Sequence, residues 1–461
     1  MLDIFTKLVI LSFFVIFSEC NNVANVIKKN SLQIPTGQCD KMEKNVTLKL
    51  SNTNSKKLID SFMDSLFINC LNLESNEITE ISPGAFKKLP NLFLLNLANN
   101  SLPTTNLISF DSHPKLRTLI GDQNLIDKKN STLRIKSKFS NLQHFYSRQN
   151  GIATLSLDIG EKLPNLTHLY LNDNLIKEIN IFPPKLTHLW LSNNYFKKFN
   201  VTQLKIIEFL QLEGNQIKII CNSYCHEFSL SLAMVKNLQT LILSHNEIND
   251  IEPDSFDDTI NLLNLDLSHN KLQIIRKGCF NFLKNLQNLS LNNNFLQKLP
   301  NFSTLQNLRQ LNISDNKIEK IEMNEFKNFP YLKQLSLSGN LLKTIEMNSF
   351  ENLMALENLD LSMNKLQHLP INWLTGVENL ETLDLRGNCF QNFASLSLDY
   401  MESLKLIFLQ NNPLLFMNTK IMANFPKSVT IYLKNDNNIN CFFNNTKSHQ
   451  LSGKIPSVLK I

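Results

Sequence analysis

A single arrangement of apolar and polar positions recurs along most of this chain. In the pattern L-x-x-L-x-L-x-x-N-x-L, leucine or another apolar residue occupies each position written L, and asparagine occupies the ninth position. Nine of the fourteen spacings between successive asparagines equal 24 residues. A fixed period of this length predicts a solenoid of stacked repeats. The fifteen repeats are anchored on Asn76, Asn100, Asn124, Asn150, Asn174, Asn194, Asn215, Asn246, Asn270, Asn294, Asn316, Asn340, Asn364, Asn388 and Asn412.

Each repeat predicts one short β-strand. Alternate residues of a strand point to opposite faces, so the two inner leucines enter the core and the x positions line an exposed sheet. The asparagine is expected to hydrogen-bond backbone groups that the tight turn would otherwise bury without partners. A second signature, with Ile five and Phe ten residues after the asparagine, is expected to fill the core from the opposite side. It occurs at Ile81/Phe86, Ile251/Phe256, Ile275/Phe280, Ile321/Phe326 and Ile345/Phe350.

These repeats resemble the extracellular leucine-rich repeat family of the 24-residue class, over roughly residues 66–415. Within that family the chain is similar to Toll-like receptor ectodomains and to secreted leucine-rich immune proteins of insects. The resemblance implies an α/β solenoid, a leucine-rich repeat horseshoe with a parallel concave β-sheet, about 15 repeats and terminal caps. The third and fourth repeats depart from the pattern, because Gly121 and Ser147 stand where an apolar residue is expected.

The two ends of the chain differ from the repeats. Lys7 precedes an apolar run, 8–17, that is shorter than the about 20 residues needed to cross a bilayer. We therefore expect residues 1–20 to be a secretory signal peptide, the alternative being a short membrane anchor. The mature protein is expected to be secreted and extracellular, without membrane insertion. The expected parts are an N-terminal cap at 21–65, the solenoid at 66–415 with a long insertion-bearing repeat at 216–245, and a C-terminal cap and tail at 416–461.

Composition excludes several classes of protein. Hydrophobic residues make up 43% of the 461, enough for a core, and 11 Gly and 15 Pro exclude collagen-like and low-complexity chains. The 46 Lys+Arg and 40 Asp+Glu give a net charge of +6 without a dense basic run, so no nucleic-acid partner is expected. Behind a signal peptide, each Asn-X-Ser/Thr sequon is a candidate glycosylation site. The sequons are at Asn45, Asn99, Asn130, Asn165, Asn200, Asn288, Asn301, Asn312 and Asn444.

The cysteines near the ends of the array suggest how the caps are fastened. Exposed solenoid ends need caps, and a Cys39–Cys70 disulfide would clip the N-terminal one. A Cys389–Cys441 disulfide would staple the C-terminal one. The family's usual C-terminal cap contains Asn-Pro-Trp-x-Cys-x-Cys, and only its first two residues, at 412–413, are present here. The C-terminal cap therefore departs from the family pattern.

Three further cysteines lie inside the array. Cys221 and Cys225 lie in the long repeat, with His226 beside them. A metal site would need further ligands at a fixed spacing, and these are absent from the sequence, so we expect the two cysteines to form a local disulfide. Removal of Cys20 with the signal peptide leaves an odd number of cysteines, and Cys279 is left over. Two interpretations remain open for it: a small, partly buried thiol, or an interchain disulfide in a homo- or heterodimer.

Histidine and aromatic residues cluster at the outward positions of repeats four to six. Neighbouring strands stack about 4.8 Å apart, so we expect two parallel rows on the concave face, bordered by Ile120. Exposed aromatic clusters often mark binding patches, in which Tyr, Trp and Arg are typical hot spots. The alternative is that aromatic residues favour strand surfaces and stack on each other. The expected ligand-binding residues are His144, Tyr146, Arg148, His168, Tyr170, His188, Trp190 and Phe209.

Two further hypotheses concern this face. Exposed imidazoles would make a contact sensitive to pH between 5 and 7, whereas zinc is not expected without carboxylate partners. Downstream, Asp266, Asp360 and Asp384 are expected to make the sheet acidic. Glycans at Asn288 and Asn312 would cover that segment and leave repeats four to eight open.

The sequence favours a secreted binding protein that recognises a protein or microbial-surface ligand through its concave face. The family resemblance implies a role in innate immunity or cell recognition, including that of a soluble decoy. The alternative is an extracellular-matrix or cell-adhesion scaffold. No catalytic triad, phosphate-binding glycine loop or metal-ligand cluster occurs in the sequence, so we expect neither an enzyme nor a cofactor.

Overall fold

The computed structural model describes residues 46–53, 56–124, 131–222, 227–398, 401–414, 429–433 and 458–460. The chain divides into two compact units, which are described separately. The N-terminal unit comprises Lys28–Ile248 and Asp254–Leu262. Of the described residues, the C-terminal unit comprises Asn249–Pro253 and those from Leu263 onward. Residues 1–45, and with them the expected signal peptide, lie outside the described residues.

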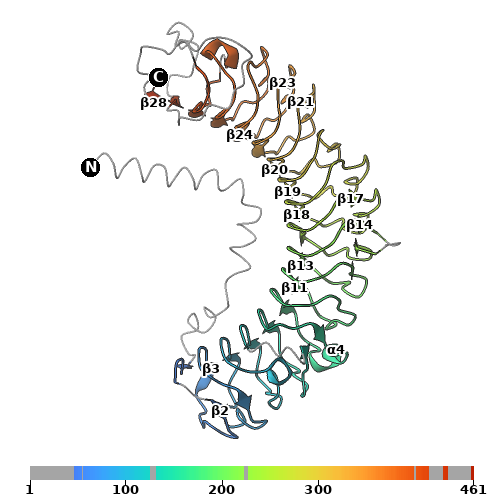
Figure 1. The fold of residues 1–461 in the computed structure, drawn as a ribbon, viewed down its shortest axis with the longest axis vertical. Coiled ribbons are helices and arrows are strands. Elements are labelled where there is room, and N and C mark those ends of the chain that lie inside the picture. Colours follow the sequence, from blue (N-terminus) through green and yellow to red (C-terminus); the bar gives the residue numbers. More distant parts are fainter. Residues whose placement is uncertain are drawn as a thin grey trace, which may run out of the picture. The chain divides into compact units, whose positions relative to one another are not determined.

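One parallel sheet, here called the main sheet, runs through the N-terminal unit (Figure 1). Its register places the predicted core leucines opposite each other, as in Leu169, Leu189 and Leu210. β1 (Val46–Lys49) pairs in parallel with β3 (Ile68–Asn72) and so extends the sheet into the region expected to be the N-terminal cap. The strands are β1 (Val46–Lys49), β3 (Ile68–Asn72), β5 (Leu94–Asn96), β6 (Thr118–Ile120), β8 (His144–Tyr146), β10 (His168–Tyr170), β11 (His188–Trp190), β13 (Phe209–Gln211) and β16 (Thr240–Ile242).

The C-terminal unit repeats this arrangement of parallel strands (Figure 1). Its register again places leucines opposite each other. Its last described strand pairs antiparallel with the strand before it and ends the run of parallel pairing. The strands are β18 (Asn264–Asp266), β19 (Asn288–Ser290), β20 (Gln310–Asn312), β22 (Gln334–Ser336), β24 (Asn358–Asp360), β25 (Thr382–Asp384), β26 (Leu406–Phe408), β27 (Thr430–Tyr432) and β28 (Val458–Lys460).

Turns and short extended segments, with little helix, connect the main-sheet strands. The predicted solenoid of about 15 turns is confirmed. The connecting strands are β2 (Lys57–Leu58), β4 (Glu80–Ile81), β7 (Thr132–Leu133), β9 (Thr154–Leu155), β12 (Phe199–Asn200), β14 (Ile219–Cys221), β15 (Ser229–Ser231), β17 (Asp250–Ile251), β21 (Lys320–Ile321) and β23 (Thr344–Ile345). The helical elements are α4 (Ile159–Lys162) and the 3-10 turns η1 (Thr104–Asn106) and η2 (Phe393–Leu396).

The core of each unit lies between the main sheet and the connecting segments. The inner leucines of the repeats are buried, and the second predicted signature is confirmed, because all five of its Ile/Phe pairs are buried. Phenylalanines of neighbouring repeats touch: the ring centroids of Phe86 and Phe110 are 5.0 Å apart, and those of Phe326 and Phe350 are 5.4 Å apart. Stability therefore comes from contacts between adjacent repeats, as expected for a solenoid.

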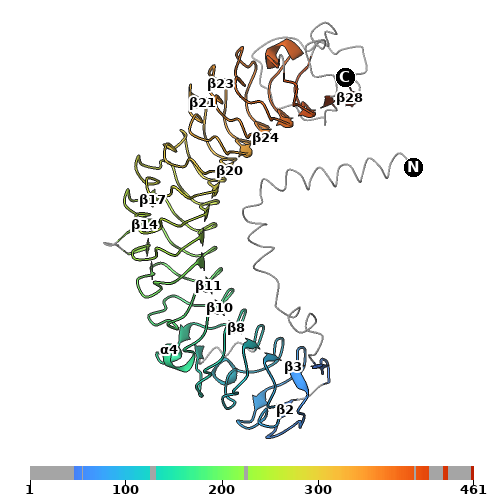
Figure 2. The same ribbon diagram turned by 180° about the vertical axis from the view of Figure 1, so that it is seen from behind.

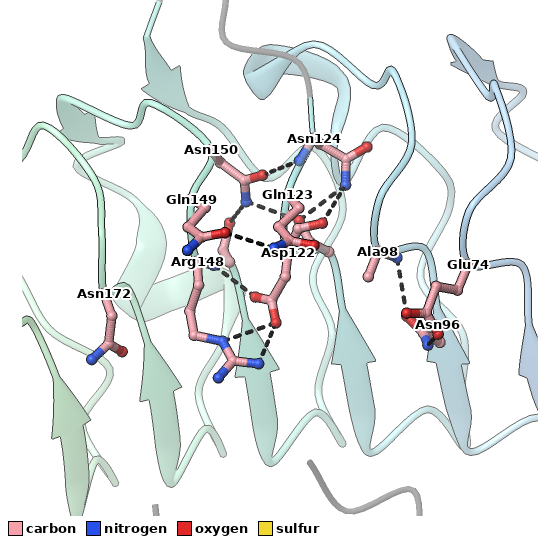
Figure 3. A network of polar contacts seen from close by, with 12 residues as sticks. Glu74, Asn96, Ala98, Asp122, Gln123, Asn124, Arg148, Gln149, Asn150 and Asn172 are labelled. Atoms are coloured by element: carbon pink, nitrogen blue, oxygen red, sulfur yellow. Dashed lines mark hydrogen bonds and ion pairs between the residues drawn. The ribbon is translucent and has the colours of Figure 1, made fainter. Parts of the chain in front are cut away.

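The repeat asparagines bind backbone groups, as predicted. Asn340 Nδ2 donates to the carbonyls of Ile313, at 2.9 Å, and Leu337, at 3.0 Å, while its Oδ1 accepts from Ile318 N–H at 3.1 Å. Figure 3 shows bonds of this kind at Asn124, whose Nδ2 donates to the Asp122 carbonyl and whose N–H donates to Asn150 Oδ1. The residue before each described repeat asparagine has a positive φ, which accounts for glycine at 214, 339 and 387.

The two degenerate repeats have local compensation. A side chain at Gly121 would place its Cβ 3.0 Å from Leu107 Cδ1, so Leu107 already fills the space of the missing apolar residue. Ser147 is fully buried, and its hydroxyl accepts a hydrogen bond of 2.8 Å from Asn150 Nδ2. A polar side chain is therefore satisfied at a core position.

The long repeat adds a strand beside two short connecting strands of the N-terminal unit. β15 pairs in parallel with β12 and with β14, so the insertion places a strand between two consecutive repeats. This arrangement explains why the spacing from Asn215 to Asn246 is longer than the others. It also brings Phe228, with φ 65°, beside Lys218, whose N–H donates to the Phe228 carbonyl at 2.8 Å.

The cysteines divide into bonded and free. Cys70, Cys221 and Cys389 are disulfide-bonded. Their expected partners, at 39, 225 and 441, lie outside the described residues, so the pairing remains a prediction. Cys279 is free and only 2% exposed, and its thiol lies 3.4 Å from the carbonyl oxygen of Ile251. Of the two open interpretations, this burial favours the small core thiol and argues against an interchain disulfide at Cys279.

Candidate functional site

The predicted His and aromatic residues lie on four neighbouring strands of the N-terminal unit, β8, β10, β11 and β13, of which Figure 2 labels the first three. The first strand position forms the histidine row, and the third position forms the aromatic stack. The other main-sheet strands from β5 to β26 carry no histidine or aromatic residue at the first position. The histidine row is His144, His168, His188 and Phe209, and the aromatic stack is Tyr146, Tyr170 and Trp190.

The aromatic stack is buried, which corrects the expectation of water-exposed rings. Tyr146, Tyr170 and Trp190 are 3%, 8% and 5% exposed. The ring centroids of Tyr146 and Tyr170 lie 4.0 Å apart and those of Tyr170 and Trp190 3.9 Å apart, so neighbouring rings cover each other's faces. The third position is buried in every main-sheet strand from β5 to β26. Ala98 and Ile120 close the same cluster on one side.

The histidine row is half-buried and forms the accessible part of the patch. The imidazole centroids of His144, His168 and His188 are separated by 4.3 Å along the row. Trp190 lies 4.8 Å, centroid to centroid, from Phe209, which ends the row. The hydroxyls of Thr167 and Thr187 lie 2.9 Å from Nδ1 of His168 and His188 and hold these two rings in place.

The histidine row is neutral at physiological pH. Burial lowers the pKa of His168 to about 3, and the neighbouring imidazoles His144 and His188 lower it further. Burial also lowers the pKa of His144 and His188, although Glu208 opposes the shift at His188. The pKa of His168 thus lies below the range between pH 5 and 7, and those of His144 and His188 are shifted in the same direction. His168 therefore does not provide the predicted switch of charge in that range.

Arg148 is tied back onto the sheet by a residue that sequence reasoning missed. Its guanidinium donates to Asp122 Oδ2 from Nη2 at 2.6 Å and from Nε at 2.9 Å, and its backbone N–H donates to Asp122 Oδ1 at 2.7 Å. Figure 3 shows this pair beside Asn124 and Asn150. Both side chains are largely buried, and the Arg148 carbon Cζ lies 5.6 Å from the centre of the Tyr146 ring. Arg148 therefore borders the patch as half of an ion pair.

Several buried polar atoms of the patch make no hydrogen bond. Six such side-chain atoms occur in the described part of the chain, and four of them are His144 Nδ1, Trp190 Nε1, Ser192 Oγ and Asn172 Oδ1. Ser192 and Asn172 lie two residues beyond the aromatic positions of β11 and β10, on the same face. Buried polar groups nearly always have a partner. Their concentration here therefore sets this part of the sheet apart from the rest.

The expected acidic face in the C-terminal unit is not exposed. Asp266, Asp360 and Asp384 are 1%, 9% and 0% exposed, because they occupy the buried third strand position. Each carboxylate accepts the backbone N–H two residues later, as from Ser268 to Asp266 at 2.9 Å. Asp384 also pairs with Arg386, and burial raises the pKa of Asp384 to about 6. These aspartates cap strand ends inside the sheet.

The sequons differ in their surroundings. On the main sheet, Asn288 Nδ2 donates to Asn264 Oδ1 at 2.6 Å, and Asn312 is 7% exposed with its Oδ1 accepting from Ser314 N–H at 3.0 Å. The burial of Asn312 and the hydrogen bond of Asn288 argue against glycans that cover the sheet. Asn165 Nδ2 donates to a backbone carbonyl at 2.7 Å. The sequon asparagines at 99, 200 and 301 are exposed, and those at 45, 130 and 444 lie outside the described residues.

Neither a metal site nor a membrane-spanning helix is found within the described ranges. There, no group of three or more His, Cys, Asp or Glu is placed to hold a metal ion. No described helix has the length and apolar character needed to cross a bilayer.

Comparison with known proteins identifies similar sequences. A family model described as Leucine rich repeat matches residues 68–126, 236–296, 284–342, 306–366 and 355–414, together more than half of the chain. Transforming growth factor beta activator LRRC33 of Danio rerio is 27% identical over 132 residues, 29% of this chain and 18% of that protein. Mimecan of Gallus gallus is 31% identical over 122 residues, 26% of this chain and 39% of that protein. The chain thus spans less than two fifths of the length of these relatives.

Solved structures extend the likeness to the fold. A leucine-rich repeat protein of Leptospira interrogans superposes with a TM-score of 0.66 and 26% identity, over 82% of this chain and 92% of that chain. A chain of the Toll–Spatzle complex of Drosophila gives a TM-score of 0.52 at 22% identity, over 82% of this chain and 47% of that chain. The expected similarity to Toll-like ectodomains is confirmed at the level of the fold.

Proposed function

Because this chain belongs to the leucine-rich repeat family, we propose that it is a binding protein whose recognition surface is the histidine row on its main sheet. The observation that carries the proposal is this continuous row of partly exposed rings on four adjacent strands, backed by a buried aromatic stack. The ligand is a discrete protein or microbial-surface molecule that contacts these strands.

The geometry favours tight binding for two reasons. The rings are held in place by mutual stacking and by threonine hydroxyls, so little side-chain entropy is lost when a ligand binds. The imidazoles are neutral, so they can stack on a ligand and exchange hydrogen bonds without the cost of desolvating a charge. A ligand group that bonded Trp190 Nε1 or His144 Nδ1 after a small ring movement would recover about 1–3 kcal/mol for each atom.

The proposed setting is extracellular, in innate immunity or cell recognition, where the protein acts as a soluble recognition or decoy module. The signal peptide, the disulfide pairs and the exposed sequons belong to this proposal. The alternative, a matrix or adhesion scaffold, would use repeated equivalent contacts along the sheet. The first strand positions of the C-terminal unit are mostly Asn, Gln and Thr, whereas the rings are confined to four strands. A compact patch favours the discrete ligand.

Burial of the aromatic stack decides how the proposal is tested. Alanine at Tyr170 or Trp190 would open a cavity and cost about 3–5 kcal/mol of stability, so loss of binding would have two explanations. The better variant is His188→Ala/Phe209→Ala, because both side chains are partly exposed. Its matched control is Gln310→Ala/Gln334→Ala, at the same strand position in the C-terminal unit.

The assay is capture from host tissue fluid by the immobilised mature protein, followed by mass spectrometry. We expect a partner that is retained by the wild-type and control proteins and lost by the His188/Phe209 variant. Circular dichroism should show that all three proteins are folded. Equal capture by the two double variants would refute the assignment of the histidine row.

A further inference from the structure

A second surface of the N-terminal unit carries a row of lysines. Lys177, Lys197 and Lys218 each follow a repeat asparagine by three residues, in three consecutive repeats. Lys198 is adjacent to the second of them. The lysines of the row are 20 and 21 residues apart in sequence, so they form no basic run, and only the stacking of the repeats brings them together.

Among the described residues, these lysines have no acidic partner, in contrast to the lysine at the same position of a later repeat. Lys343 occupies the same position in a later repeat, and its Nζ lies 2.8 Å from the carboxylate of Glu319, one repeat earlier. In the described part of the chain, lysines of several other repeats are paired in a similar way, but none of the lysines 177, 197, 198 and 218 is. Unpaired like charges in adjacent repeats repel each other, and a bound polyanion would relieve that repulsion.

A groove of about 980 Å³ lies along the row. The lysines at 177, 197 and 198 line it, with Glu178 as its one acidic residue. Tyr195, which is 45% exposed, and the amides of Asn180, Asn200 and Gln216 contribute the rest of its polar chemistry. The groove shares no residue with the histidine row.

The inserted strand positions the end of the row. Phe228, which directly precedes β15, has Lys197 Nζ at 5.4 Å and Lys218 Nζ at 4.5 Å from its ring centre. Cation–π contacts of this kind hold an ammonium group in place while leaving it charged. The insertion therefore spaces two lysines of adjacent repeats around an aromatic ring.

We propose that this groove binds an anionic polysaccharide, one that bears sulfate or carboxylate groups. The ammonium groups would bind the anions, the amides would bind hydroxyls, and the exposed Tyr195 ring would stack on a sugar face. An acidic peptide would use the lysines but would gain little from the amide groups. A nucleic-acid site would be expected to show arginine and a denser basic surface, and no arginine lines the groove.

The test measures binding of a size-defined heparin oligosaccharide as the probe, by calorimetry over a range of salt concentrations. All proteins carry Thr202→Ala, which removes the sequon at Asn200 on the groove wall, so that a glycan of the chain itself cannot occupy the site. We expect Lys177→Gln/Lys197→Gln/Lys198→Gln to weaken binding about tenfold or more. The slope of log affinity against log salt should fall by about two to three, since fewer counterions are released.

The control removes the same charge from lysines that are already paired. Lys333→Gln/Lys343→Gln/Lys405→Gln lowers the net charge equally at exposed ion pairs, which contribute little stability. We expect it to bind the probe like the parent. Equal loss in both triple variants, or no binding of the parent, would overturn the proposal.

Two further arms test the recognition of sugar. Tyr195→Ala should weaken binding several-fold with an unchanged salt slope, whereas Tyr331→Ala, at a tyrosine that is 58% exposed in the C-terminal unit, should have no effect. Poly-glutamate should bind more weakly than the oligosaccharide, and neutral dextran should not bind. Tighter binding of poly-glutamate would assign the groove to acidic peptides instead. Because the groove and the histidine row are separate, either proposal can fail while the other stands.

Discussion

Acidification is expected to loosen the strands that carry the histidine row, and His168 is the residue that should dominate the effect. Burial and the two flanking imidazoles lower its pKa to about 3 in the folded protein, against 6.5 for an unperturbed histidine. Between these two values, the unfolded chain binds a proton that the folded protein does not. The contribution of His168 to stability is therefore fully present above pH 6.5 and is lost as the pH falls towards 3.

The size of the effect follows from the two pKa values. Lowering the pH from 7.5 to 5 should cost about 2 kcal/mol through His168 alone, which is about a 30-fold rise in the local opening equilibrium. His144 and His188 act in the same direction, because their pKa values are also lowered by burial. A solenoid need not unfold as one unit, so the effect has to be measured locally.

Hydrogen exchange followed by mass spectrometry, corrected for the intrinsic effect of pH, gives the local measurement. Peptides covering β8, β10 and β11 should lose protection at pH 5, and His168→Gln should remove about 2 kcal/mol of that pH dependence. His368→Gln, at an exposed histidine in the C-terminal unit, should leave it unchanged. If His168→Gln and the wild-type protein show the same dependence on pH, the burial argument for His168 is wrong.

Three further predictions concern the frame that holds the site. Asn340→Ala should lower stability by about 3 kcal/mol in denaturation experiments, because Ile318 N–H and two carbonyls would be buried without partners. Burial raises the pKa of Asp384 to about 6. The stability of the wild-type protein relative to Asp384→Asn should therefore be greatest below pH 4 and fall by about 3 kcal/mol by pH 7. A stability difference that does not depend on pH would contradict this. Cys279, whose thiol pKa is raised by burial, should react with maleimide only after unfolding, and rapid labelling of the native protein would contradict its burial.

Much of the fold was predictable because the residue pattern within each repeat indicates the structure of that repeat. The spacing of the leucines gave the strands, the repeat asparagine gave the turn, and the Ile/Phe signature gave the second side of the core. These assignments depend on residues within one repeat and on the repetition of that pattern. The degenerate repeats needed the structure, because Leu107 fills the space beside Gly121 from outside the pattern.

The sequence predicted where the candidate site lies on the sheet, but not how exposed its side chains are. The histidines and aromatic residues were assigned to adjacent strands, and the register confirms that they stack. The third strand position was predicted to be open, whereas the rings of Tyr170 and Trp190 cover each other and are buried. Likewise, no sequence pattern indicates that Asp122, 26 residues earlier, binds the Arg148 guanidinium.

By itself, the sequence determined the repeat, its period and the face of the strand to which each residue belongs, because these follow from local periodicity and from the hydrogen-bonding capacity of asparagine. Only the tertiary structure decided what each outward side chain meets. In a solenoid, the nearest neighbour of a residue lies one repeat away, about 20 to 30 positions along the chain. The neighbouring repeats bury the aromatic stack, keep the histidine row neutral and bring the unpaired lysines together. These features therefore arise only when the repeats stack.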